Sequence, residues 1–448
     1  MFTLSVCQYG ADFCSDATWE SWDPPPDARY DPKSLLQKSV WASRGWTMQE
    51  LLFSKRLLYF TEQGPYWECY NTCRSILTSE RLVSGMSICK NVPRAFHRRP
   101  WPDIDHFAGV ITDYNHRELT YDFDVLRALA GVTASMEEIF PGGFLFGLPV
   151  LFFHWALLWD TRRQGRARQL HRSSGQTLPS WSWISMQGEL DLELYASACD
   201  YILKSNQTTH YLKERGSLTV LPIVQFKVRV NGSQKSELAP LPPTYDLHRT
   251  ISRSFFAHAP PGWTKRPPWR KKWVSFHHAS DPDTAFAFPL PNHSEVQSST
   301  ANMVSNHLHF RARRAFFMMS VPARDSFQGG EWFCNHSMLF DTQKRPAGVA
   351  TVHAQIEEES YIMMNPSQKP RSGEFIAISE GSMQLSKDET RFKTEVELLG
   401  PFLNGKYEFY NVLYISRRDG IAYREALGRV KKLAWEAANP KEIDVVLG

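Results

Sequence analysis

The stretch 40–60, VWASRGWTMQELLFSKRLLYF, passes directly from a helix-like pattern to a strand-like one. Trp46 and Glu50 are four residues apart, so in a helix they would share one face. Two short strand candidates, RLLYF and GPYWECY, follow and are separated by a Gly-Pro turn signal. A helix flanked by strands predicts an α/β segment. Such a small segment cannot bury a core of its own and must pack on the rest of the chain.

The remaining sequence divides into two further parts. Residues 76–178 are expected to be mainly helical, because FDVLRALAGVTASMEEIF places apolar side chains near one helix face. Residues 179–448 are expected to be β-rich, because GSLTVLPIVQFKVRV and EFYNVLYIS alternate or are β-branched. We therefore predict an α+β fold with a partial α/β segment in residues 1–75, in which residues 1–37 supply a loop.

Charge and cysteine content exclude several classes of protein. The chain has 51 Lys and Arg against 47 Asp and Glu, a net charge of +4, which gives no overall attraction to nucleic acid or an anionic membrane. Its seven cysteines are scattered and odd in number, so a disulfide framework is not expected. The first residues lack a secretory signal pattern. We expect a cytoplasmic protein.

Signatures of cofactor and metal sites are also missing. The sequence has no G-x-G-x-x-G, P-loop, H-E-x-x-H or nucleophile elbow, so no cofactor is expected. Cys69 and Cys73 lie four residues apart, but a structural zinc site needs a fuller ligand set. The neighbouring histidines His277 and His278 are expected at the surface rather than as metal ligands.

The apolar segment 140–159, FPGGFLFGLPVLFFHWALLW, allows two interpretations. It is uncharged and about as long as a membrane span, and a basic run follows it. Its two prolines and three glycines break the helical pattern. We therefore favour a buried loop with a short helix over a transmembrane helix, and expect no membrane partner.

A basic region near 255–280 interleaves cations with tryptophans. Such a pattern is used to bind single-stranded nucleic acid, because rings stack on bases while cations meet phosphates. Its four prolines favour a solvated surface loop instead, so no specific nucleic acid partner is expected. The aromatic residues concerned are Trp263, Trp269 and Trp273.

Two tryptophans in the segment LPSWSWISMQG have a structural interpretation. Trp181 and Trp183 are expected to pack the helical middle against the β-rich region. Indoles bury a large area, and their N–H groups need fixed hydrogen-bond partners when they are buried. A packing role is therefore favoured over a catalytic one.

The segment SRGWTMQELLFSKRLLYFTEQGPYWEC resembles the closing signature of the fungal heterokaryon-incompatibility (HET) domain family, R-[AG]-W-T-x-Q-E-x-x-L-S-x-R-x-L-x-F followed by an aromatic-W-E-C strand. The pair LLWDTRR and LPSWSWISMQG, and the last 39 residues, also resemble segments that follow this domain. The family's opening A-L-S-Y-x-W-G strand is absent, so residues 1–75 would correspond to the C-terminal third of a truncated HET domain. The matching positions are Arg44, Trp46, Thr47, Gln49, Glu50, Ser54, Arg56, Leu58, Phe60, Trp67, Glu68 and Cys69.

This resemblance implies a role in fungal non-self recognition and programmed cell death. The chain would act mainly through contacts with other proteins of the incompatibility system and would be incomplete as an effector. HET domains are regarded as similar in fold to TIR domains, and TIR enzymes that cleave NAD carry a W-x-x-x-E helix, which WTMQE matches.

The alternative function is therefore that of a TIR-like NAD glycohydrolase. Glu50 would stabilise the oxocarbenium ion or act as a general base, and Trp46 would face the departing ring. Against this, Trp46 could simply belong to the core, and Glu50 could pair with Arg44 or Arg56 or face water.

Overall fold

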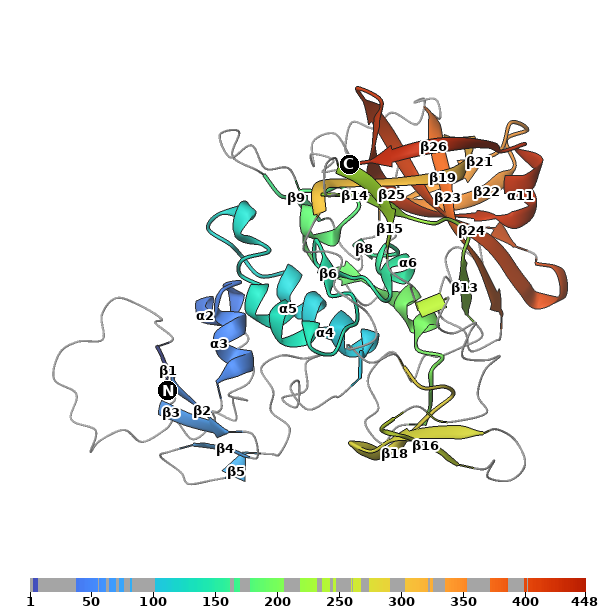
Figure 1. The fold of residues 1–448 in the computed structure, drawn as a ribbon. Coiled ribbons are helices and arrows are strands. Elements are labelled where there is room, and N and C mark those ends of the chain that lie inside the picture. The colour runs from blue at the N-terminus through green and yellow to red at the C-terminus, as the bar shows by residue number, and fades with distance from the viewer. Residues whose placement is uncertain are drawn as a thin grey trace.

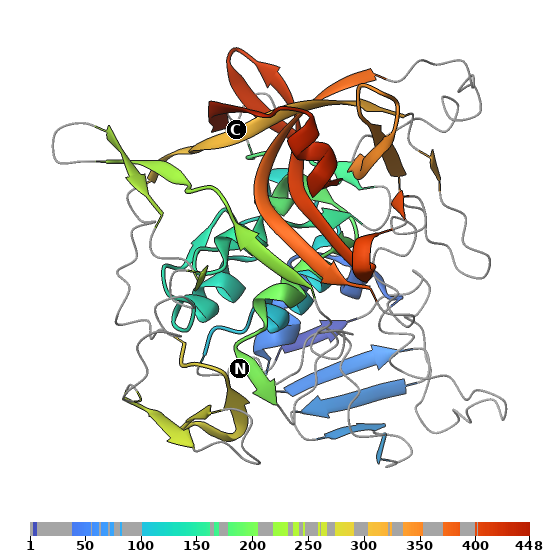
Figure 2. The same cartoon turned by 90° about the vertical axis from the view of Figure 1, so that its right-hand side faces the viewer.

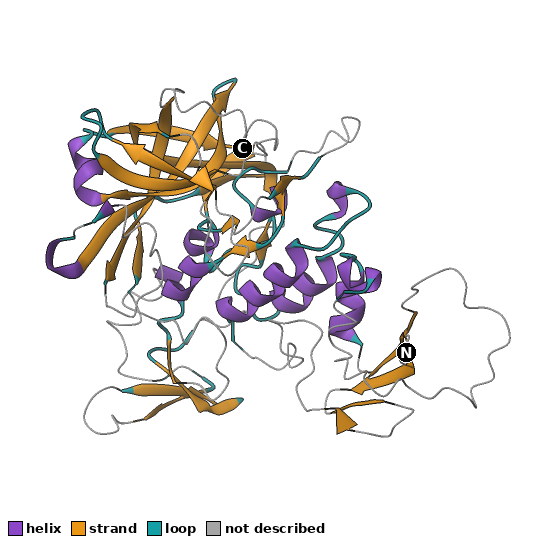
Figure 3. Ribbon diagram, turned by 180° about the vertical axis from the view of Figure 1, so that it is seen from behind, coloured by secondary structure: helices purple, strands orange, loops and turns teal. Residues whose placement is uncertain are grey.

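The computed structural model is a mixed α+β protein in which most strands gather in one large sheet (Figure 1). Helices lie between this sheet and a small N-terminal sheet, as the purple and orange elements of Figure 3 show. The structure describes residues 3–6, 38–54, 56–61, 64–69, 72–75, 81–82, 101–161, 165–169, 178–204, 218–231, 236–241, 245–246, 259, 261–266, 274–290, 303–320, 323–324, 335–352, 371–385, 399–400 and 402–448.

The N-terminal sheet has the strand order β1-β2-β3-β4-β5. β1 runs parallel to β2, and the remaining neighbours are antiparallel. The two expected strands of the opening motif are confirmed as β2 and β3. The expectation that residues 1–37 form a loop is wrong at residues 3–6, where alternating apolar residues suit a strand. The strands are β1 (Thr3–Val6), β2 (Arg56–Thr61), β3 (Gly64–Cys69), β4 (Thr72–Ser75) and β5 (Arg81–Leu82).

Two short helices, α2 (Val40–Ser43) and α3 (Thr47–Phe53), connect the parallel strands. A single helix was expected here, but it is interrupted between Ser43 and Thr47, because the Ser43 carbonyl and the Gly45 N–H bond to Glu118 and not within a helix. The Glu118 N–H donates to the Ser43 carbonyl at 2.6 Å, and the Gly45 N–H donates to the Glu118 carbonyl at 2.8 Å. A Cβ on Gly45 would lie 2.5 Å from the Leu119 side chain, so glycine permits this close approach.

The middle region, which was expected to be mainly helical, contains short helices joined by turns and by short strands. Its first helix is capped by the Asp103 carboxylate, which accepts from the Asp105 and His106 amides at 3.1 Å. The helix expected from Phe123 onward starts as a short 3-10 turn and becomes α-helical seven residues later. The elements are α4 (Ile104–Asn115), η3 (Asp122–Asp124), α5 (Ala130–Glu137) and α6 (Phe153–Ala156).

The apolar segment 140–159 forms a hairpin and a four-residue helix. Strands β6 (Phe144–Leu145) and β7 (Leu148–Pro149) precede α6, and most of the side chains are buried. This confirms the interpretation as a buried loop with a short helix. The hairpin turns at Gly147, where φ is +77° and a Cβ would crowd Trp183. Among the described residues, no helix is long and apolar enough to cross a membrane.

Within the residues that the structure describes, the large sheet has eleven strands, which confirms the β-rich C-terminal region (Figure 2). The short helix α11 (Lys432–Ala437) packs against β24 and β25. The strands are β13 (Thr219–Pro222), β14 (Lys227–Asn231), β15 (Ser236–Pro240), β19 (Met303–Met319), β20 (Ala323–Arg324), β21 (Asn335–Phe340), β22 (Pro346–Val352), β23 (Arg371–Gln384), β24 (Lys406–Arg418), β25 (Ile421–Lys431) and β26 (Lys441–Leu447).

This sheet closes on itself through the long strand β19. The last third of β19 pairs with β23 on one side and β21 on the other, while its earlier part pairs with β26 and β14. Within this sheet, glycine permits close pairing of β22 with β25. A Cβ on Gly348 would lie 2.2 Å from the Arg429 carbonyl oxygen across the ladder.

A separate four-stranded sheet corrects the expected surface loop near 255–280. Its order is β12-β18-β17-β16. Trp263 is buried with its ring 4.9 Å from that of Phe286, so it serves the core and not as an exposed stacking platform. Trp269 and Trp273 lie outside the described residues. The strands are β12 (Ile202–Lys204), β16 (Trp263–Arg266), β17 (Ser275–His278) and β18 (Asp281–Phe286).

Tryptophans join the helical middle to the large sheet, as expected. Trp181 and Trp183 are fully buried. The Trp181 indole N–H donates to the Asn306 carbonyl on β19 at 2.9 Å, and the Trp183 N–H donates to the Gly147 carbonyl at 3.0 Å. One hydrophobic core therefore extends from the helices into the sheet across residue 178. The boundaries at residues 75 and 178 remain predictions about folding units.

Arg424 of β25 makes a second link between these parts. Its buried guanidinium donates to the carbonyls of Leu157, at 2.7 Å, and of Trp159, and lies 3.9 Å from the centre of the Trp159 ring. The Trp159 N–H in turn donates to the Trp181 carbonyl at 2.8 Å. Burial lowers the pKa of Arg424 to about 10, opposed by the charge of Asp160. The buried guanidinium and the two carbonyls thus satisfy each other's hydrogen-bonding needs away from water.

Asp160 is the carboxylate of this buried cluster. It lies in the small ladder of β8 (Asp160–Thr161) and β11 (Leu190–Asp191), directly opposite Asp191. Burial raises its pKa to about 7, the charge of Arg424 lowers it and the charge of Asp191 raises it further. Arg424 is therefore needed to compensate a carboxylate as well as two carbonyls.

We predict that Arg424→Met lowers the free energy of unfolding by about 3–5 kcal/mol, because it leaves a buried carboxylate and two carbonyls without their cation. The control is Arg418→Met, since Arg418 lies 5.5 Å from the Tyr423 ring but is exposed. That change should cost about 1 kcal/mol or less. Urea unfolding followed by tryptophan fluorescence measures both. Equal losses for the two variants would contradict the assigned role of Arg424.

Candidate functional site

The opening motif forms the α2–α3 turn and places Trp46 and Glu50 on one side of it. Trp46 is the residue before the first turn of α3 and is 45% exposed, and Glu50 lies one turn later with its side chain exposed. Thr47 fixes the turn, because its hydroxyl donates to the carbonyls of Trp41 and Arg44. Met48 on the opposite side is fully buried. The helix therefore presents a defined outer face.

Glu50 has a partner that the sequence pattern does not reveal. Its Oε2 accepts a hydrogen bond of 3.2 Å from the indole Nε1 of Trp41, nine residues earlier. The Trp41 ring is held by an edge contact with buried Tyr59 of β2, at 5.9 Å between centroids. The Glu50 carboxylate is thus oriented by a buried indole while one side remains open to solvent. Among the described contacts, neither Arg44 nor Arg56 pairs with it.

Arg44 and Gln49 serve to position α3. Arg44 forms an isolated β-bridge with Glu118, and its carbonyl accepts a hydrogen bond of 3.4 Å from the Arg117 guanidinium. The Gln49 amide nitrogen donates to the carbonyls of Ala128 and, at 3.4 Å, of Arg127. A Cβ at position 131 would lie 2.4 Å from Gln49 Oε1, so Gly131 makes room for this side chain. Gln49 therefore joins α3 to the turn that leads into α5.

The remaining motif residues lie on the hairpin that follows. Arg56 is exposed at the start of β2 and pairs with Cys69 of β3, while Trp67 and Glu68 face Leu58 and Leu57 in register. The side chains of these three β3 residues, and of Cys73, lie outside what the structure describes. The ladder places Trp67, Glu68 and Cys69 beside the β2 end nearest α3. Their contribution to the site remains a prediction.

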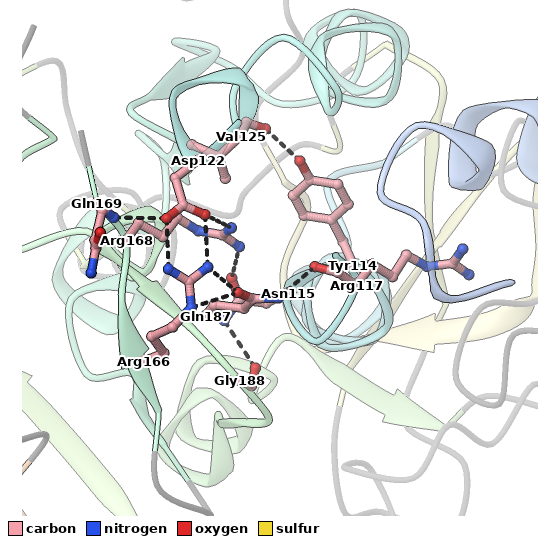
Figure 4. A network of polar contacts seen from close by, with 10 residues as sticks. All are labelled: Tyr114, Asn115, Arg117, Asp122, Val125, Arg166, Arg168, Gln169, Gln187 and Gly188. Carbon is pink, nitrogen blue, oxygen red and sulfur yellow. Dashed lines mark hydrogen bonds and ion pairs between the residues drawn. The ribbon is translucent and has the colours of Figure 1, made fainter. Parts of the chain in front are cut away.

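A second polar cluster surrounds Asp122, and Figure 4 shows how its side chains converge. Arg166 makes two hydrogen bonds to this carboxylate, at 2.7 and 2.8 Å, and the backbone N–H of Gln169 donates a third at 2.7 Å. Buried Arg168 lies 3.6 Å from Asp122 and donates to Asn115 at 3.2 Å. Arg166 and Gln187 belong to a short ladder of β9 (Arg166–Ala167) with β10 (Met186–Gln187).

The Asp122 cluster fixes the segment 115–118, whose Glu118 backbone bonds the α2–α3 turn. We call this cluster the Asp122 clamp. Burial alone would raise the pKa of Asp122, but the hydrogen bond from Arg166, the Gln169 amide and the charges of Arg166 and Arg168 hold it below its usual value. Gln187 also donates to the Arg117 carbonyl at 3.0 Å, next to Glu118. Because the Asp122 carboxylate already accepts these hydrogen bonds, the clamp positions the backbone rather than offering a carboxylate to a ligand.

Comparison with known proteins returned nothing: no family model, curated protein or solved structure matches this chain. The resemblance to the HET family therefore depends on the motif residues themselves. Within the described ranges, no group of three or more His, Cys, Asp and Glu side chains is arranged to hold a metal ion.

We predict that Gln49→Ala loosens α3 from the turn that leads into α5 while leaving the large sheet intact. Losing two hydrogen bonds worth about 1 kcal/mol each should speed amide exchange in α3 by about 5- to 30-fold. The matched control is Gln169→Ala, because the side chain of Gln169 is exposed. Hydrogen-deuterium exchange measured by mass spectrometry distinguishes the two. Unchanged α3 protection in Gln49→Ala would refute the positioning role.

Proposed function

We propose that this chain is a HET-like protein of fungal non-self recognition that acts through protein contacts and promotes programmed cell death. The observation that carries the proposal is an exposed apolar surface on the two helices of the HET-like motif. Val40 is 63% exposed, Trp46 45% and Phe53 36%. We call these three residues the α2–α3 face. Large apolar side chains that stay exposed on neighbouring helices are typical of protein interaction sites.

The underside of the α2–α3 face is firmly attached. Trp41, Ala42 and Leu57 form a small buried cluster with Tyr59, and Gln49 fixes α3 to the turn that leads into α5. A rigid helix face loses little conformational entropy on binding, so its exposed aromatic side chains can contribute most of their burial to affinity. This supports a recognition role better than a packing role.

The chemistry of the α2–α3 face suggests its partners. Trp46, Glu50 and Phe53 recur at the four- and three-residue spacing of one helix face. A complementary surface would offer an apolar groove with a cation or hydrogen-bond donor opposite Glu50. We assign this partner to the other proteins of the incompatibility system, as the family resemblance implies.

We predict that expressing the chain in a filamentous fungus lowers cell viability, and that the double change Trp46→Ala with Phe53→Ala removes at least 90% of this effect. Leu433→Ala is the matched control, because Leu433 is 76% exposed on α11, away from the motif. Vital-dye staining gives the fraction of dead cells, and circular dichroism checks folding. Toxicity that survives in the folded double variant, or no toxicity from the unaltered chain, would contradict the proposal.

A second candidate function is TIR-like cleavage of NAD at Glu50. The observation in its favour is a carboxylate that is exposed, oriented by the Trp41 indole and one helical turn from the half-exposed Trp46 ring. Breaking the N-glycosidic bond creates oxocarbenium character, which such a carboxylate stabilises while the indole faces nicotinamide. Water completes the reaction and yields ADP-ribose, nicotinamide and a proton.

This candidate predicts that the chain releases nicotinamide from NAD and that Glu50→Gln slows release by about 100-fold or more, since the charge is lost but the shape is kept. Glu118→Gln is the control, because the Glu118 side chain is also exposed and beside the α2–α3 turn. Chromatography of NAD and nicotinamide provides the rates. Equal release by the unaltered chain and Glu50→Gln, or no release at all, would exclude NAD cleavage.

A further inference from the structure

A serine and a histidine contact each other on one strand of the four-stranded sheet. Ser275 and His277 are two residues apart on β17, so their side chains lie on the same face. The distance from Ser275 Oγ to His277 Nε2 is 3.1 Å. His277 is 7% exposed, which corrects its expected place at the surface, while Ser275 is half-buried. A hydroxyl is thus open to solvent above a shielded imidazole.

The other ring nitrogen of His277 determines where the proton lies. Nδ1 is 2.8 Å from the backbone carbonyl of Pro282. A carbonyl can only accept, so Nδ1 must carry hydrogen, and the neutral ring then presents Nε2 as an acceptor. The Ser275 hydroxyl must therefore donate to Nε2. A nucleophile, a base and a group that orients the base are the parts of an activated serine.

The turn that supplies the Pro282 carbonyl is itself fixed. The Asp281 carboxylate accepts from the Thr284 hydroxyl at 2.8 Å and from the Thr284 and Asp283 amides at 3.2 and 3.3 Å. Thr264 of β16 donates to the His277 carbonyl at 3.3 Å. The imidazole is consequently held by the Pro282 carbonyl of β18, and the backbone of His277 by Thr264 of β16, before any substrate arrives.

A cation stands across the ladder from the serine. In the β16–β17 register, Arg266 is opposite Ser275 and Thr264 is opposite His277. Opposite residues of antiparallel strands have Cβ atoms about 4.5–5.5 Å apart on the same face, so the exposed Arg266 side chain can reach a group bound at Ser275. Its guanidinium can donate to a developing oxyanion and attract a negatively charged substrate.

The opposite face of the sheet anchors it to the protein. Phe276 and Phe286 are buried there, and the Trp101 ring lies 5.1 Å from Phe286 in an edge contact. An apolar inner face and a polar outer face with converging functional groups are what a surface site on a small sheet requires.

We propose that Ser275 and His277 form a nucleophile–base pair that hydrolyses esters whose acyl part carries a free carboxylate. This site is independent of the α2–α3 face. Ser275 Oγ bonds to the ester carbonyl carbon, its proton passes to His277 Nε2, and the carbonyl oxygen becomes an oxyanion beside Arg266. The carbon–oxygen bond to the alcohol then breaks, and His277 returns its proton to the departing alcohol oxygen. Water, deprotonated by His277, releases the carboxylic acid and restores Ser275.

The test incubates the full chain with the 4-nitrophenyl monoester of succinic acid and, in parallel, with neutral 4-nitrophenyl acetate. We expect a burst of nitrophenol and a succinyl group on the Ser275 peptide in mass spectrometry. Ser275→Ala should lower the burst rate by about 100-fold or more. Ser280→Ala, at an exposed serine in the same turn, should leave it unchanged.

Arg266→Gln supplies a second readout that a purely structural hydrogen bond would not affect. It should raise KM for the succinate ester by about tenfold and leave KM for the acetate ester nearly unchanged, because a neutral acyl group gains little from the cation. No adduct on Ser275, an adduct that forms equally fast on Ser280, or equal rates for the unaltered chain and Ser275→Ala would overturn the proposal.

Discussion

The buried Arg424 guanidinium lies over the Trp159 ring and joins the large sheet to the helical middle. This contact brings β25, the residues that follow α6 and the buried Asp160 together. The Trp159 indole bonds the Trp181 carbonyl, and the Trp181 indole in turn bonds Asn306 of β19. Without Arg424, the Leu157 and Trp159 carbonyls and the buried Asp160 carboxylate would lose their cation, at a cost of several kcal/mol. The helices that support α2 and α3 can hold their position because the sheet holds them.

Local patterns predicted those features that local chemistry controls. The β2–β3 hairpin, the broken apolar segment 140–159 and the buried roles of Trp181 and Trp183 could all be inferred from turn residues, periodicity and the needs of an indole. The division of the motif helix could not, because the groups that interrupt it come from Glu118, far along the chain. The pairing of residues 3–6 with β2 could not be predicted either, because the partner strand lies far along the chain.

The candidate sites show the same limit. Trp46 and Glu50 were identifiable from their spacing, but Trp41 was not, since it lies on a different helix and reaches Glu50 through the turn at Gly45. Ser275 and His277 were hidden inside a basic, proline-rich sequence that favours a loop. Their contact depends on β-pairing and on a carbonyl five residues further along, neither of which leaves a motif.

The helical middle and the large sheet should unfold as one cooperative unit, because Arg424, Trp159 and Trp181 join them. The most direct test is limited proteolysis of the full chain along a urea gradient, with fragments identified by mass spectrometry. We expect fragments from both regions to appear at the same urea concentration. A stable fragment that begins near residue 180 and keeps its β-sheet signal after the helices are digested would contradict this expectation.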